Sequence, residues 1–325
     1  MVAKRRTGSR VIPSSEADTR STAKPSRWIR IERPLQLPAY LKEGLSILDD
    51  AGHLAYVVGG SVRDGILGRV AKDHDVATSA DPNEVCRLFP NGLTVGKAFG
   101  VIKVPIPTGE VMEIATFRRD LEYKDHRHPE GILFAGPAED AQRRDFTINA
   151  LFYDPKTQRI LDTVGGLADL KARVIRAIGN PSERFREDAL RLMRLVRLAE
   201  QLAFSIEAET EHAAIARAKL IGRVSPERVR TELELLLDGP APAAALKRLL
   251  KYGLLEVILP EVALLHGVKQ PSILNPEGVE KNVFLQALRV FEFLRRTQEK
   301  ISHILAWAAL LAGTGKAAAA KRSGG

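Results

Sequence analysis

The sequence predicts a two-part fold, a small mixed α/β region followed by an all-α region. Three observations carry this prediction. Between residues 38 and 180, short apolar runs typical of strands alternate with helical segments. From about residue 182 onward, apolar residues recur at helical spacing, with glycines or prolines between the segments. The chain has 325 residues, of which 45% are hydrophobic and 27% charged; this fits about two globular domains and excludes a disordered protein.

The α/β region is predicted to open with a helix over residues 40–52, because its apolar residues gather on one side. Residues 55–58 form an apolar run that ends at two glycines, which is typical of a buried strand meeting a turn. Residues 100–106 and 110–117 are predicted to pair as a hairpin, since the Pro-Thr-Gly between them has turn chemistry. Further expected segments are helices at 62–67 and 82–89, a strand at 74–77, and short apolar segments at 148–153 and 160–164.

Two longer regions complete the predicted organisation. The polar stretch 118–136 lacks periodicity, and an aperiodic loop of that length is usually functional or mobile. The second half is predicted to be a helical array without a repeat of fixed period. Its expected helices cover residues 183–202, 207–221, 225–237, 242–252, 283–297 and 301–311.

The charge balance points to an acidic polymer as partner. Lys and Arg total 49 against 40 Asp and Glu, a net charge of +9. Residues 1–35 hold nine basic and three acidic residues, and they are expected to be either a solvated disordered tail or an arm that contacts phosphates. The single cysteine, Cys86, excludes an intrachain disulfide and a cysteine zinc site. No apolar run approaches the roughly 18 residues of a membrane span, so we expect a cytoplasmic protein without a membrane partner.

A glycine turn followed by paired aspartates is the most informative feature. Gly59-Gly60-Ser61 follows a predicted strand, and a turn of this kind can offer backbone N–H groups to a triphosphate. Asp73 and Asp75 lie on one face of an extended segment, where two carboxylates repel each other unless a cation lies between them. Mg²⁺ suits this arrangement, because it binds one or two carboxylates together with substrate phosphates.

A third carboxylate, Glu113, stands in an otherwise apolar predicted strand. Ordinary alternation would also make Glu113 a solvent-facing residue. Beside Asp73 and Asp75 we interpret it as a metal ligand, which completes a site for two-metal nucleotidyl transfer. His126 and His128 lack a cysteine or acidic cluster to complete a metal site.

Four ordered motifs between about residues 38 and 265 resemble those of the class II tRNA nucleotidyltransferases (CCA-adding enzymes) and bacterial poly(A) polymerases. Residues 59–64 (GGSVRD) with 72–75 (KDHD) are similar to the family's first motif, and 115–118 (ATFR) follows the third carboxylate as in the family. Residues 143–150 (RRDFTINA) resemble its ribose-recognition motif and 183–191 (ERFREDALR) its base-recognition motif. The resemblance implies a polymerase-β-like nucleotidyltransferase palm followed by helical neck, body and tail regions.

The resemblance also assigns roles to residues. Asp73, Asp75 and Glu113 are the expected catalytic carboxylates and Mg²⁺ ligands. Asp145 would accept from a ribose 2′-hydroxyl and Arg144 would contact triphosphate. Asp188 and Arg191, three positions apart on one predicted helix face, would imitate a Watson–Crick edge for both C and A; an exposed ion pair is the alternative. The complete predicted nucleotide-binding set is Gly59, Gly60, Ser61, Arg63, Arg118, Arg143, Arg144, Asp145, Asn149, Glu187, Asp188, Arg191 and Arg194.

The C-terminal region departs from the family pattern. Residues 275–278 (NPEG) and 310–316 (LLAGTGK) are similar to the opening of an HD-type phosphohydrolase domain, but Ala312 and Gly313 stand where a His-Asp pair is expected. We therefore predict no phosphohydrolase activity. We also expect the shortened region to weaken tRNA binding, which disfavours full CCA synthesis. The expected regions are a basic disordered tail (1–37), the palm (38–180), a neck and body (181–265), and a helical tail with an HD-like remnant (266–325).

The leading functional hypothesis is addition of C and A residues to the 3′ end of tRNA from CTP and ATP. The same motifs serve poly(A) addition to RNA, and enzymes that add only CC or only A are further alternatives. A catalytically inactive RNA-binding module is a hypothesis of a different class, which the three retained acids disfavour. The sequence gives no oligomeric state.

Overall fold

A seven-stranded mixed sheet forms the first half of the fold. A computed structural model describes residues 27–71, 73–94, 100–120, 132–269, 282–297 and 302–315. The strand order is β1-β9-β8-β2-β3-β5-β4, and β3 and β5 run parallel while the other neighbours run antiparallel. The strands are β1 (Arg27–Arg30), β2 (Ala55–Val58), β3 (His74–Thr78), β4 (Val101–Pro105), β5 (Val111–Thr116), β8 (Leu151–Asp154) and β9 (Arg159–Asp162).

The two faces of this sheet have different surroundings, because side chains alternate along each strand. On one face, Met112 and Ile114 of β5 are buried. Helix α1 (Ala39–Asp50) approaches Met112 so closely that a Cβ on Gly44 would lie 2.6 Å from Met112 Cε. The opposite face carries Asp75 and Glu113. The other helices of this half are α2 (Gly60–Ile66), α3 (Pro82–Leu88), α4 (Pro137–Gln142), η2 (Thr147–Asn149) and α5 (Gly166–Ala172).

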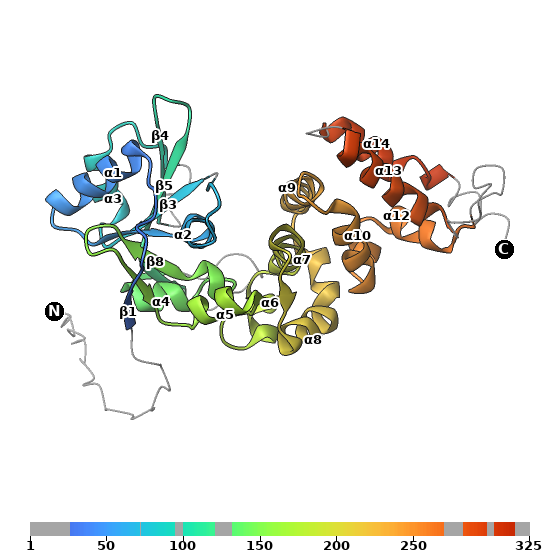
Figure 1. Cartoon of the computed structure of the whole chain (residues 1–325), viewed down its shortest axis with the longest axis horizontal. Helices are drawn as coiled ribbons and strands as arrows, with labels where there is room; N and C mark the ends of the chain where they lie inside the picture. Colours follow the sequence, from blue (N-terminus) through green and yellow to red (C-terminus); the bar gives the residue numbers. More distant parts are fainter. Residues whose placement is uncertain are drawn as a thin grey trace, which may run out of the picture.

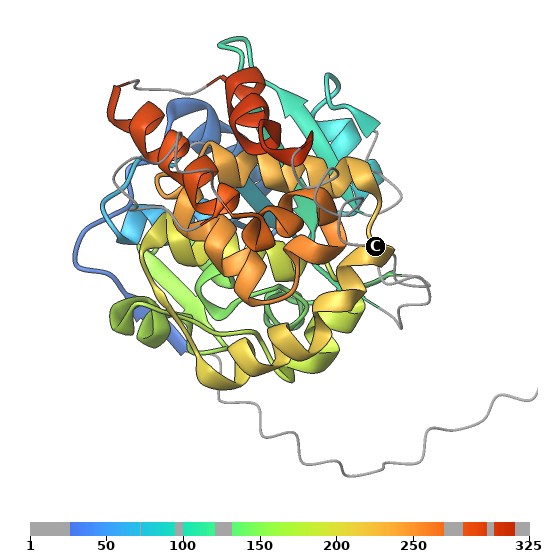
Figure 2. The same cartoon turned by 90° about the vertical axis from the view of Figure 1, so that its right-hand side faces the viewer.

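The second half is a helical array that extends away from the sheet (Figure 1), so that it lies in front of the sheet when the molecule is viewed from that end (Figure 2). A short parallel pair, β10 (Val174–Ile175) with β11 (Ser205–Ile206), lies at the junction. The last helices of the array lie at the opposite end of the molecule from the sheet (Figure 1). Its elements are α6 (Pro181–Glu187), α7 (Arg191–Leu202), α8 (Ala208–Arg217), η3 (Ala218–Arg223), α9 (Pro226–Leu237), α10 (Pro242–Lys251), α11 (Leu255–Ile258), α12 (Pro260–Leu264), η4 (Leu265–Gly267), α13 (Val283–Thr297) and α14 (His303–Leu311).

The predicted succession of a small mixed sheet with helices and an all-α array is confirmed. The predicted start of the α/β region at residue 38 is wrong, because β1 (Arg27–Arg30) precedes it and pairs with β9. Leu35 and Leu37 then pack against the core, so this segment is held by burial of apolar side chains.

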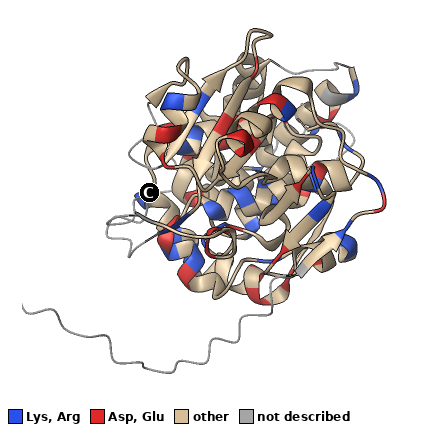
Figure 3. Ribbon diagram, turned by 90° about the vertical axis from the view of Figure 1, so that its left-hand side faces the viewer, with Lys and Arg blue, Asp and Glu red and all other residues tan. Residues whose placement is uncertain are grey.

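Acidic and basic residues are interspersed over the α/β half (Figure 3).

Two further segments differ from the prediction. Part of the aperiodic stretch 118–136 forms a small ladder, β6 (Arg118–Asp120) with β7 (Ile132–Phe134), whose second strand is apolar. The predicted helix over 183–202 is two helices, since Asp188 adopts an extended backbone at the end of α6 and its carboxylate accepts the Leu190 N–H at 3.1 Å. An Asp side chain that bonds nearby backbone competes with helix continuation.

Several expectations fall on residues that the structure does not describe: the basic segment 1–26, Lys72, His126, His128 and residues 275–278. No helix in the described ranges is long and apolar enough to cross a membrane. The cytoplasmic location stays a prediction.

Candidate active site

Asp75 and Glu113 are direct register partners across the parallel strands β3 and β5, so their side chains leave the same face of the sheet. Asp73 immediately precedes β3 and is exposed. Burial and the nearby Glu113 charge, against the opposing effect of Arg144, raise the pKa of Asp75 to about 6. The structure therefore brings Asp75 and Glu113 together on one face of the sheet, and Asp73 lies near enough for its charge to act on Asp75.

Glu113 has a partner that the sequence analysis missed. Lys103 is its register partner on β4, and Lys103 Nζ lies 2.5 Å from Glu113 Oε1. The Glu113 charge, followed by Asp75 and Asp73, raises the pKa of Lys103. The sequence offered one signal, since Lys103 stands in a predicted strand rich in Val and Ile. Only the strand register shows that Glu113 is its neighbour.

The donor set fits a divalent cation in part. Within the described ranges, no three His, Cys, Asp or Glu side chains converge as a preformed metal site. Asp73 and Asp75 offer two carboxylates at the start of β3, and carboxylates are the donors that Mg²⁺ uses together with phosphate oxygens. The Glu113 carboxylate is paired with Lys103. That Glu113 joins Asp73 and Asp75 as a metal ligand stays a prediction.

The glycine turn approaches these acids closely. Gly59 has φ of +75° and ψ of −141°, a conformation that only glycine adopts without strain. A Cβ at Gly59 would lie 3.2 Å from Asp75 Oδ2 and 3.7 Å from Arg144 Nη1. Gly60 begins α2, and the Ser61 hydroxyl donates to the Val58 carbonyl at 3.0 Å. The Ser61 side chain therefore shapes the turn.

Arg63 is buried, in contrast to the nucleotide contact predicted for it. Its guanidinium donates to both oxygens of Asp64 at 2.9 Å and to Asn149 Oδ1 at 2.7 Å. Asn149 Nδ2 in turn donates to Asp145 Oδ1 at 3.1 Å. The first motif and the ribose-type motif are thus joined through a buried chain of hydrogen bonds, and Arg63 braces that chain.

Asp145 is held from two sides. The Phe146 N–H donates to Oδ1 at 2.7 Å, and Arg194 of α7 donates to Oδ2 from Nε at 2.9 Å and from Nη2 at 2.7 Å. Burial would raise the pKa of Asp145, but Arg194 and Asn149 stabilise the carboxylate and lower the pKa to about 2. Asp145 is therefore an acceptor throughout the physiological pH range.

A second residue that sequence reasoning missed, Asp140 of α4, lies between the predicted arginines. Asp140 Oδ1 is 2.7 Å from Arg143 Nη2, and Oδ2 is 3.0 Å from Arg144 Nη2. The Arg118 backbone N–H donates to Oδ1 at 3.3 Å. Burial opposes ionisation of Asp140, but Arg144 and Arg143 outweigh it and lower its pKa.

The predicted base-reading pair is separated by the helix break. Asp188 accepts a bidentate ion pair from Arg228 of α9, with Nη2 to Oδ2 at 2.8 Å and Nη1 to Oδ1 at 3.2 Å. Arg191 is buried and donates to Glu187 Oε2 at 2.6 Å and to the Arg143 carbonyl at 3.1 Å. The expectation that Asp188 and Arg191 share one helix face is wrong, because α7 begins after the turn at Asp188.

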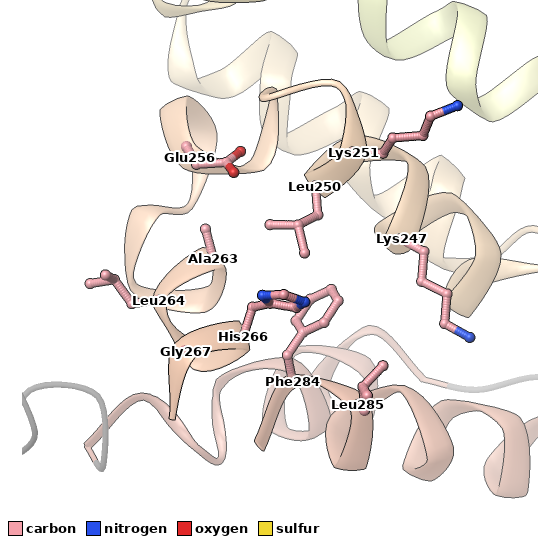
Figure 4. A pocket seen from close by; sticks show the side chains of 10 residues that line it. All are labelled: Lys247, Leu250, Lys251, Glu256, Ala263, Leu264, His266, Gly267, Phe284 and Leu285. Carbon is pink, nitrogen blue, oxygen red and sulfur yellow. The ribbon is translucent and has the colours of Figure 1, made fainter. Parts of the chain in front are cut away.

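The cavity of about 590 Å³ shown in Figure 4 lies in the helical half, away from these residues. It is bounded by α10, η4 and α13, with apolar walls formed by residues such as Leu250 and Phe284. Lys247 lies at its rim (Figure 4). None of the predicted site residues lines it.

The sequence of this chain is similar to those of known proteins. The family described as "Poly A polymerase head domain" matches residues 55–176, and "Probable RNA and SrmB- binding site of polymerase A" matches residues 203–265. A curated CCA-adding enzyme of Bacillus velezensis is 46% identical over 224 residues, which cover 69% of this chain and 55% of that protein. One of Geobacillus thermodenitrificans is 46% identical over 208 residues, covering 64% and 51%. The chain thus spans about half the length of these curated relatives.

Solved structures agree with this likeness. The Bacillus stearothermophilus CCA-adding enzyme in complex with CTP has 31% identity and a TM-score of 0.62, covering 86% of this chain and 71% of that chain. A tRNA nucleotidyltransferase with a primer tRNA and an incoming ATP analog has 29% identity and a TM-score of 0.61, covering 82% and 74%. With this coverage, the chain belongs to the family of class II tRNA nucleotidyltransferases and bacterial poly(A) polymerases.

Proposed function

We propose that this protein is a template-independent RNA nucleotidyltransferase that adds C and A residues to the 3′ end of tRNA, using CTP and ATP and releasing pyrophosphate. One observation carries the proposal: Asp75 and Glu113 lie in register beside the Gly59 turn, with Arg144 at the same place. This arrangement combines acids for a metal with groups for a triphosphate. The relatives that were solved with CTP, with an ATP analog and with a primer tRNA support the choice of substrates.

Asp73 and Asp75, with Glu113 once it leaves Lys103, would hold Mg²⁺. When bound, Mg²⁺ supplies Lewis-acid activation of the attacking 3′-hydroxyl and stabilises the pyrophosphate leaving group. Asp145 accepts a hydrogen bond from the ribose 2′-hydroxyl of the nucleotide. Arg143 and Arg144 bind the triphosphate, because guanidinium groups match phosphate oxygens in charge and geometry.

Asp188 reads the base, and Arg191, which donates to Glu187 and to the Arg143 carbonyl, joins this segment to the ribose-recognition motif. Each carboxylate oxygen has two acceptor positions, so Asp188 can accept from the exocyclic amino group of C or A while Arg228 still holds it. Arg228 also keeps Asp188 in one orientation. This division gives Asp188 the reading role and Arg228 the supporting one.

A second candidate function is poly(A) addition. It is favoured by the match of residues 55–176 to a poly(A) polymerase head domain. The catalytic chemistry would be the same, and only the RNA substrate and the end point of addition would differ. CC-only and A-only activities are further outcomes of the same assay.

The test is nucleotide incorporation by the purified protein with Mg²⁺. The RNA substrates are tRNAs that end before CCA, before the second C or before A, and a generic RNA serves as control. Each receives CTP, ATP or both. Addition that stops after CCA, and only on tRNA, is the expected result; long A tails on any RNA would replace it by poly(A) polymerase.

The matching variant is the double substitution Asp73→Ala and Asp75→Ala. We expect it to abolish incorporation while most RNA affinity remains, measured by a gel-shift titration. A protein that adds nothing to any RNA, and whose RNA binding is the same in both forms, would instead be an RNA-binding module.

A further inference from the structure

Asp140 is a buried carboxylate that touches two guanidinium groups at once. Its side chain is 1% exposed. Oδ1 accepts from Arg143 Nε at 2.8 Å, and Oδ2 accepts from Arg144 Nε at 3.2 Å, in addition to the Nη2 contacts of both arginines. Charge-assisted bonds of this fork type fix orientation as well as charge. One short helix, α4, therefore anchors two cations at defined angles.

The edge of Arg144 that faces away from Asp140 is directed into the site. Its Nη1 lies 3.7 Å from the position of a Cβ on Gly59, and its guanidinium carbon lies 5.0 Å from the centre of the Phe152 ring. Nε and Nη2 are used by Asp140, and within the described residues the structure gives Nη1 no hydrogen bond. Asp140 thus leaves the Nη1 edge of Arg144 available beside the glycine turn.

The charges of these three residues also indicate an anion-binding site beside the glycine turn. Asp140 neutralises one of the two guanidinium charges, and the arginine side chains are only 20% and 16% exposed. The remaining charge also acts on the Asp75 carboxylate, which is the expected Mg²⁺ ligand. A partly buried excess cation favours an anion, because water screens it poorly. The anion that fits beside a glycine turn and a carboxylate pair is a phosphate chain.

We propose that Asp140 is the positioning residue that holds Arg143 and Arg144 toward the triphosphate of the incoming nucleotide. The inference rests on the proposed function, to which it adds a residue that contacts no substrate. Asp140 acts through the two arginines. Its removal therefore changes nucleotide affinity more than the rate of the chemical step.

The experiment compares Asp140→Asn with the wild type. Asparagine keeps the size, but it offers one acceptor and turns an N–H group toward the other arginine. We expect the Kd of ATP, measured by calorimetry, and the KM of ATP to rise by about 10- to 100-fold, as for other residues that orient a ligand-contacting group. We expect kcat to change by less than about threefold. An unchanged Kd would overturn the proposal.

Glu200→Gln is the matched control. Glu200 is 16% exposed and lies 2.6 Å from Arg248, between α7 and α10. This change also takes a carboxylate from an arginine, so it should lower thermal stability while leaving the Kd of ATP unchanged. If it weakens ATP binding as much as Asp140→Asn does, the effect of Asp140 is general destabilisation and the proposal is wrong.

A second comparison places Asp140→Asn in a protein that already carries Arg143→Ala and Arg144→Ala. A positioning role predicts no further loss of ATP affinity, since residues that act as a unit are not additive. A further tenfold loss would contradict it. Should Asp140→Asn not fold, Asp140→Glu keeps the charge but shifts the carboxylate; weaker ATP binding is then expected, and wild-type affinity would overturn the proposal.

These readouts separate the two levels of inference. If the wild type binds ATP but adds no nucleotide to any RNA, the proposed function fails, and Asp140 is still judged by the ATP affinities. If the wild type binds no ATP, the inference about Asp140 fails as well.

Discussion

Arg228 of α9 holds Asp188, the residue that ends α6, by a bidentate ion pair. One turn further along α9, Glu232 pairs with Arg197 of α7. A helix of the array is therefore joined at two successive points to the segment expected to read the base. If Asp188 reads the base as proposed, we expect nucleotide selection to depend on Arg228, forty positions away in the sequence.

Replacing Arg228 by alanine should loosen base selection. Asp188 then loses the group that fixes its carboxylate, and we expect discrimination of C and A against U and G to fall by about tenfold. Incorporation of each of the four nucleotides would be measured separately. Arg230→Ala is the control, since Arg230 lies on the same helix, is 71% exposed and pairs with Glu234. Equal losses in both variants would contradict a role for the Asp188 contact.

Replacing Gly59 by alanine should abolish turnover as well as cost stability. This backbone conformation costs about 1–3 kcal/mol for a residue with a Cβ, and the new methyl group would press on Asp75. Gly52→Ala is the matched control: Gly52 has φ of +83°, and nothing lies within 4 Å of its Cβ position. Denaturant unfolding and incorporation would be measured for both. A Gly52 variant that is inactive, or a Gly59 variant that is active, would refute this explanation.

Asp145 should make the protein sensitive to acid. Its pKa is about 2 in the fold, against an ordinary value of 3.8. A lowered pKa stabilises the fold above the ordinary value, and this stability is lost as the pH falls from about 4 to about 2. The shift corresponds to roughly 2 kcal/mol. Asp145→Asn should therefore show a shallower fall of unfolding free energy over this range; a slope equal to that of the wild type would be the contrary result.

Lys103 should compete with divalent metal for Glu113. Lys103→Met removes the cation that pairs with Glu113. Because a largely exposed ion pair is worth up to about 1 kcal/mol, Mn²⁺ binding measured by electron paramagnetic resonance should tighten by roughly fivefold. Lys156→Met, which removes an exposed lysine paired with Asp49, should leave Mn²⁺ binding unchanged. Weaker Mn²⁺ binding in the Lys103 variant would show that Lys103 supports the metal instead.

Much of the fold could be predicted because its signals are local. Apolar periodicity predicted α13 over its full length, and turn chemistry predicted the β4–β5 hairpin. The break after Glu187 could not be read, since the helical pattern continues through it and the cause is a side-chain bond of Asp188. β1 was missed because its partner, β9, is far away in the sequence.

The candidate site likewise contains residues that the motifs predicted and residues that only the structure revealed. The motifs named Asp75, Glu113 and Asp145, but sequence spacing cannot show that Asp75 and Glu113 are register partners. Asp140 and Arg228 escaped notice because each acts through contacts with other charged residues, and an isolated acid or arginine on a helix is usually a solvated surface residue. Arg63 stands in the first motif, yet its buried contacts are with Asp64 and Asn149.

The parallel pairing of β3 with β5 also constrains the order of events during synthesis. Parallel neighbours require a crossover, and here the chain forms α3 and β4 before β5 returns beside β3. Local hairpins close quickly, whereas contacts between distant segments form slowly. A ribosome must therefore release the chain well beyond residue 116 before Asp75 and Glu113 can meet. A nascent chain halted earlier cannot bring the two acids together, so the carboxylate pair depends on pairing between separate strands and not on a local hairpin.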